Sequence, residues 1–102
     1  MAQFTEQTTN VTAVPNGSTS GVALAANPAR VFYKIQNTST NPLYVLYGSG
    51  TASASNCHEI LKACTTGSDG IGGIINSSEV VYTGIIAVGG TAPAFTAYEL
   101  AP

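Results

Sequence analysis

Charge is scarce in this chain of 102 residues. Asp, Glu, Lys and Arg together make up 8% of it, against about 25% in an average soluble domain. With three basic residues and a formal net charge of −2, the chain cannot make the several phosphate contacts that drive nucleic-acid binding. We therefore expect no nucleic-acid partner.

Long apolar segments are also lacking. No apolar run approaches 18 residues, so the sequence predicts no membrane span. The first 20 residues are polar and lack the charged start and apolar block of a secretory signal, so we expect synthesis and retention in a cytoplasm. In that compartment Cys57 and Cys64 are expected as reduced thiols, although a turn between them would bring a disulfide within reach.

Groups that carry chemistry are few and scattered. The single histidine, His58, stands between Cys57 and Glu59, but neighbours on a strand point to opposite faces and no acidic partner is signalled. With Cys64 this set still falls short of the usual tetrahedral metal site. The sequence therefore predicts no catalytic residue, no cofactor and no metal site, and we expect the protein not to be an enzyme.

The glycine-rich stretch SDGIGG at Ser68–Gly73 superficially resembles a phosphate-binding loop. It lacks the lysine that such a loop needs, and its Asp-Gly and Gly-Gly pairs are typical of turns. Asp69 and Glu79 are weak candidates for calcium ligands, because two separate carboxylates do not define a site. We interpret the stretch as a loop or tight hairpin.

What the chain does contain is a β pattern. Apolar residues make up 44%, and small neutral polar residues take the place of charges. In Val31–Gln36, Val31, Tyr33 and Ile35 share one face, and Leu43–Tyr47 alternates in the same way. We expect further strands over Asn10–Val14, Gly21–Ala25, His58–Leu61, Glu79–Tyr82, Gly84–Val88 and Ala94–Leu100.

Turn signals separate these segments at roughly ten-residue spacing, which favours an all-β fold. We predict a flexible N-terminal arm over residues 1–9. We predict one β-sandwich domain over residues 10–102, jelly-roll-like, with about seven or eight short antiparallel strands. The stretch NTSTNP between Gln36 and Leu43 predicts a hairpin with a long loop, and Asn37 is suited to bond its own backbone there.

The order of several motifs resembles small structural proteins of tailed bacteriophages. RVFYKIQN is followed by NPLYVLYG and the small-residue run TASAS, then by ILKA, DGIGG, YTGIIAV and AYEL. The resemblance covers about 70 residues, Arg30 to Leu100. The Cys-His-Glu segment at Cys57–Glu59 and the N-terminal thirty residues lie outside the pattern.

This resemblance implies a virion protein, a capsid decoration (cement) protein that is made in the bacterial host cytoplasm and binds the capsid exterior. Its expected partners are the major capsid protein and further copies of itself, with a trimer favoured and a dimer as the competitor. No membrane partner is expected. We expect the contact residues to be Phe4, Arg30, Tyr44 and Tyr47, with Phe4 as the anchor of the N-terminal arm.

Two alternatives remain open at this point. Arg30 has a purely structural interpretation, in which it pairs with a carboxylate or with carbonyls at strand ends. The protein as a whole has a second functional interpretation, a head-fibre or tail-associated binding module that recognises a host glycan or receptor. In that case stacking surfaces would come from Tyr33, Tyr44, Tyr47, Tyr82 and Tyr98.

Overall fold

The computed structural model describes residues 10–77 and 81–102. These residues form eight β-strands, and the prediction of an all-β sandwich is confirmed. The strands are β1 (Asn10–Gly17), β2 (Gly21–Leu24), β3 (Phe32–Asn37), β4 (Leu43–Tyr47), β5 (Glu59–Leu61), β6 (Ile74–Asn76), β7 (Ile86–Gly89) and β8 (Phe95–Ala101). In the part of the chain described, no helix is long and apolar enough to cross a membrane.

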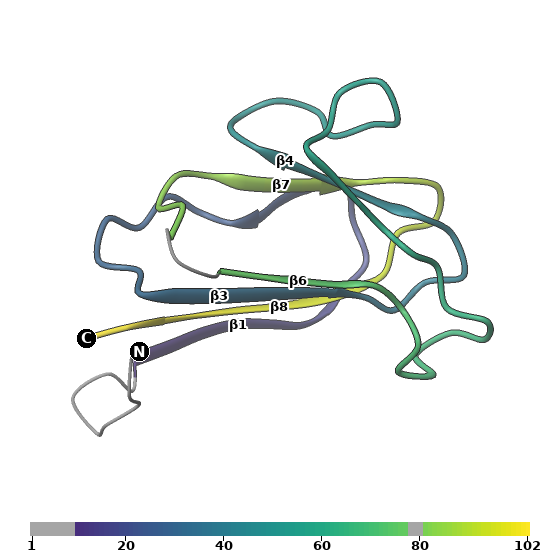
Figure 1. Ribbon diagram of the computed structural model, residues 1–102, viewed down its shortest axis with the longest axis horizontal. Coiled ribbons are helices and arrows are strands. Elements are labelled where there is room, and N and C mark those ends of the chain that lie inside the picture. The colour runs from purple at the N-terminus through teal and green to yellow at the C-terminus, as the bar shows by residue number, and fades with distance from the viewer. Residues whose placement is uncertain (1–9, 78–80) are drawn as a thin grey trace.

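The strands form two four-stranded antiparallel sheets (Figure 1). Sheet A has the order β1-β8-β3-β6, and sheet B has the order β2-β7-β4-β5. The first strand pairs with the last, the second with the seventh, the third with the sixth and the fourth with the fifth. This is the connectivity of a long hairpin wrapped into a double-sheet jelly roll.

Alternating side chains build the core between the sheets. Along β8 the burial alternates residue by residue, and along β3 Tyr33 and Ile35 point inward as predicted. The main apolar cluster consists of Ala23, Leu24, Tyr33, Ile35, Leu43, Val45, Leu61, Ile86, Val88, Phe95 and Ala97. Along β3 and β8 one face is buried, so the alternation fixes which residues of these two strands face the core.

The predicted hairpin across NTSTNP is wrong. Strand β3 pairs with β8 and β6 in sheet A, whereas β4 pairs with β7 and β5 in sheet B. The segment therefore crosses from one sheet to the other. Both strands are apolar on one face and find partners far along the chain, so nearness in sequence does not decide their pairing.

Three other expectations need correction. Val31 precedes β3 and is exposed, so it does not join Tyr33 and Ile35 in the core. The strand Ile74–Asn76 was not predicted, since the preceding glycines indicated only a loop. For the predicted strand Glu79–Tyr82, residues 79 and 80 lie outside the described residues, and Val81 and Tyr82 are not in a strand.

Asn37 joins the loops at one end of the sandwich. Its Oδ1 accepts the N–H of Ser39 at 2.9 Å, which confirms the expected local turn. Its fully buried amide nitrogen donates to the carbonyl oxygens of Asn41, Leu61 and Lys62 at 2.8–3.1 Å. A Cβ at Gly72 would collide with Asn37 O, so this close approach requires glycine.

The connection between β4 and β5 folds back over the outer face of sheet B (Figure 1). Ala52 from this connection packs with Leu46 and Ala87 in a second buried cluster, beside the partly buried Tyr44. A Cβ at Gly89 would overlap Ala52 O, so glycine lets the loop lie directly on the strand. The centre of this outer face is therefore covered by the chain itself.

Candidate functional site

The predicted contact residues do not form one site. Phe4 lies outside the described residues, so its role as an anchor stays a prediction. Tyr44 and Tyr47 stand on opposite faces of β4, because three positions separate them along a strand. Tyr44 lies on the outer side of sheet B, whereas Tyr47 packs against the main core.

Arg30 is an interior residue. Its side chain is 0% exposed, and its Nε donates to Glu99 Oε1 at 2.8 Å. The second carboxylate oxygen of Glu99 accepts from Asn27 Nδ2 at 2.6 Å. The guanidinium carbon also lies 5.9 Å from the centre of the Tyr33 ring. Glu99 is itself buried and neutralises the charge of Arg30.

The remaining donors of Arg30 bond the backbone just after β2 and the backbone before β7. One terminal nitrogen donates to Tyr82 O at 2.7 Å and to Gly84 O at 3.1 Å, and the other donates to Ala25 O at 2.7 Å. The structural interpretation of Arg30, pairing with a carboxylate and with backbone carbonyls, is thus confirmed. This network leaves the guanidinium no surface on which a partner could contact it in this conformation.

Tyr47 belongs to an aromatic cluster near the same end. Its hydroxyl accepts a 2.9 Å hydrogen bond from the Tyr33 hydroxyl, and its ring lies 5.2 Å from that of Tyr82. Burial, followed by the contact with Tyr33, raises the pKa of the Tyr47 hydroxyl well above its ordinary value. Tyr47 therefore stays neutral at all ordinary pH values and fills a structural role within this cluster.

His58 is exposed, and both its ring and its Nδ1 contact Tyr47. Its ring stacks on Tyr47 with 5.6 Å between centres, and its Nδ1 accepts the Tyr47 backbone N–H at 3.0 Å. Cys57 and Cys64 are free thiols, the first partly exposed and the second buried with Sγ directed at Asn37 O. Across residues 10–77 and 81–102, no group of three or more His, Cys, Asp and Glu side chains is arranged to hold a metal.

Asp69 organises the loop between β5 and β6. Its Oδ2 accepts the N–H groups of Thr65 and Thr66 at 3.0 and 2.8 Å, and its Oδ1 accepts that of Ile71 at 2.9 Å. The other calcium candidate, Glu79, lies outside the described residues. Both carboxylate oxygens of Asp69 thus serve the backbone, and the structure gives this residue the role of a turn cap.

The same bonds predict an acid response. The N–H of Thr66, followed by that of Ile71, lowers the pKa of Asp69 to about 2 from its ordinary 3.8. Because the folded-state pKa is lowered, the stabilisation is present above pH 3.8 and is lost as the pH falls towards 2. Between pH 3.8 and 2, the urea concentration at the unfolding midpoint should therefore fall less in Asp69→Asn than in the unchanged protein. An equal fall in both proteins would contradict this assignment.

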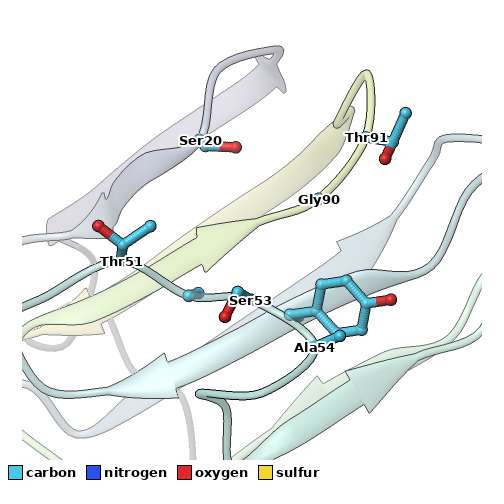
Figure 2. Close-up of a pocket in the computed structure, with 8 residues that line it drawn as sticks. Ser20, Thr51, Ser53, Ala54, Gly90 and Thr91 are labelled. Atoms are coloured by element: carbon cyan, nitrogen blue, oxygen red, sulfur yellow. The ribbon is translucent and has the colours of Figure 1, made fainter.

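A groove opens beside Tyr44 on the outer side of sheet B. It has a volume of about 430 Å³ and lies where three connections meet, those between β1 and β2, β4 and β5, and β7 and β8. Figure 2 shows Ser20 and Thr91 across the groove from the segment that carries Thr51, Ser53 and Ala54. The residues that line it are Ser20, Tyr44, Thr51, Ala52, Ser53, Ala54, Gly90 and Thr91.

The outer face of sheet A is the other surface of note. The register aligns Val11, Leu100 and Phe32 in a row across β1, β8 and β3. Tyr98, on the next row, packs its ring 5.9 Å from that of Phe32. By the same register, Lys34 is the one charged residue among the described positions of this face. An apolar, aromatic face with so little charge has the composition of a protein interface.

Sequence reasoning did not single out either surface. The Ser and Thr hydroxyls of the groove come from three loops, and these residue types are too common in this chain for any of them to stand out. The apolar row on sheet A consists of residues on three strands, and only the strand order brings them together. The alternation along the strand did contain one signal for this face. With Tyr33 and Ile35 facing the core, Phe32 is expected on the outer face of the sheet.

Comparisons of the chain with protein-family models, curated protein sequences and solved structures gave no match. The strand order identifies the fold as an antiparallel jelly roll. This architecture is found in viral capsid proteins, lectins and cupins. Since one fold serves many functions, the function must be inferred from the surfaces.

Proposed function

We propose that the protein is a structural virion protein, a capsid decoration protein that binds the outside of a shell and stabilises contacts between coat subunits. The observation that supports this proposal best is the outer face of sheet A, which carries the row of Val11, Leu100 and Phe32. Among the described positions of this face, only Lys34 is charged. Val11 is 58% exposed. Apolar and aromatic surface with few charges favours association, since little desolvation of charge opposes it.

The size of this face suits the role. Figure 1 views the sheets from their edges along the shortest axis of the molecule, so each sheet face spans the longest and shortest dimensions, 37 and 21 Å. A standard protein interface buries about 800 Å² on each partner, and the full extent of this side of the molecule, loops included, is close to that area. The order of the sequence motifs resembles that of small phage structural proteins, and this resemblance favours the same partner, the major capsid protein.

A matched pair of substitutions tests the contact face. Val11 and Val22 are 58% and 60% exposed and lie on edge strands of opposite sheets. We expect Val11→Lys to weaken binding to isolated capsids of the encoding phage by about tenfold or more, because a charge would be buried without a partner. Val22→Lys should leave binding unchanged. Co-sedimentation of each variant with capsids measures both.

The possible outcomes separate the function from the choice of face. If the unchanged protein does not bind capsids, the decoration role is wrong. If it binds and both lysine variants bind equally well, the role stands and sheet A is not the contact face. Assembly into a trimer, favoured over a dimer, stays a prediction that the solution mass by light scattering would check.

A further inference from the structure

We infer that the groove beside Tyr44 is a binding site for a neutral saccharide. This site is separate from the proposed capsid contact, because it lies on the sheet B side of the sandwich and the apolar row lies on sheet A. All eight lining residues are uncharged, and five of them carry a hydroxyl group.

Most of these hydroxyl groups are unused by the protein. Within the described part of the chain, the side-chain hydroxyls of Ser20, Tyr44, Thr51 and Thr91 make no hydrogen bond, while Ser53 meets only Ser55 at 3.3 Å. Hydroxyl groups both donate and accept. Four of them gathered around one groove can therefore exchange hydrogen bonds with a ligand that itself presents alternating donors and acceptors.

Tyr44 supplies the apolar element of the site. It lies on the outer side of β4 beside Leu46 and Ala87 and is partly exposed at the groove. Aromatic side chains combine an apolar surface with a polar tip. A sugar ring matches this lining, since its C–H groups form an apolar face and its hydroxyls form a polar edge. The absence of charge in the lining disfavours phosphorylated or acidic ligands.

The wall of the groove is held in place before any ligand arrives. Ser53 and Asn56 exchange two backbone hydrogen bonds of 3.0 Å, and Asn56 Nδ2 donates to Thr51 O at 3.0 Å. Ala52 is buried against Leu46 and Ala87. A preformed wall reduces the entropy that binding would otherwise cost. The volume of about 430 Å³ lies within the range of small-ligand sites, about 300–1,000 Å³.

Titration of the full chain with neutral oligosaccharides, followed by amide NMR spectra, tests this site. The probes are maltotriose, cellotriose, mannotriose and N-acetylchitotriose, with sialyllactose as the charged comparison. We expect at least one neutral probe to shift the amide signals of residues 51–54 and 90–91, with a dissociation constant in the millimolar range. Sialyllactose should shift them less.

Two variants and a control locate the binding. Tyr44→Ala should weaken the binding of the tightest-binding oligosaccharide by about tenfold, which corresponds to about 1.4 kcal/mol of binding free energy. Thr51→Trp, at an exposed position, should block the groove without disturbing the core. Tyr98→Ala removes a tyrosine from the opposite sheet and should bind as the unchanged protein does. The dispersion of the amide signals reports whether each variant is folded.

Several results would overturn the inference. The first is that no neutral probe shifts these amides at about 20 mM, a concentration that would reveal millimolar binding. The second is that a folded Thr51→Trp variant binds as well as the unchanged protein. The third is that sialyllactose binds as tightly as the neutral probes. None of these outcomes bears on capsid binding, which is measured separately.

Discussion

Arg30→Ala is expected to lower the free energy of unfolding by about 3–5 kcal/mol, the usual cost of removing one partner from a buried ion pair. The substitution would leave the carboxylate of Glu99 buried, with Asn27 as its remaining partner. It would also remove the donor from three backbone carbonyls. Equilibrium unfolding in urea, followed by circular dichroism, measures the change.

Lys62→Ala is the matched control for this prediction. It also removes one positive charge, but from an exposed side chain, so its effect should stay within about 0.5 kcal/mol. Arg30→Ala combined with Glu99→Ala should cost less than the sum of the two single changes, because the pair is coupled. If Arg30→Ala is as stable as Lys62→Ala, the network does not hold the sandwich together.

Asn37→Ala is expected to lower the free energy of unfolding by roughly 3 kcal/mol, since unsatisfied buried polar groups cost about 1–3 kcal/mol each. The carbonyls of Asn41, Leu61 and Lys62 would lose their shared donor. The connections from β3 to β4 and from β5 to β6 should then loosen together. Urea unfolding measures the loss, and amide hydrogen exchange at residues 61–64 reports the local opening.

Asn37→Asp separates the lost donor from the lost volume. The carboxylate keeps nearly the same shape and still accepts from Ser39 N–H, but it cannot donate to the three carbonyls. We expect this variant to be strongly destabilised at neutral pH. Because those carbonyls disfavour the charged form, the deficit should shrink as the pH falls and the acid is protonated.

The control for position 37 is Asn76→Ala, which removes an exposed asparagine from the edge strand β6. Its effect should stay within about 0.5 kcal/mol. Equal stability of Asn37→Ala and Asn76→Ala would refute the assigned role of Asn37. A deficit of Asn37→Asp that does not change with pH would show that packing, and not the donor, accounts for the loss.

Much of the fold could be predicted from local pattern. The alternation of Tyr33 and Ile35 with polar neighbours identified β3 and its buried face, and Leu43–Tyr47 was predicted with the observed bounds. Asn37 was identified as a residue that bonds its own backbone. These features depend on a few neighbouring residues, so a single sequence contains what is needed to recognise them.

The pairing of the strands could not be predicted in the same way. The alternation in a segment shows which of its faces is apolar, but it does not specify which other strand pairs with that segment. The hairpin expected across NTSTNP was therefore wrong, and β3 and β4 lie in different sheets. Arg30 illustrates the same limit, because only the packing of β8 beside β3 brings Glu99 within 2.8 Å of it.

The all-β class, the low charge of the surface and most of the strand positions could be read from the sequence, since composition and alternation are local properties. Which residues share a surface depends on the tertiary structure. Ser20, Tyr44 and Thr91 meet at one groove, and Val11, Phe32 and Leu100 form one row. These residues become neighbours because strands that are far apart in the sequence pair with one another. Burial of the whole core favours one strand order over the alternatives that local pattern permits.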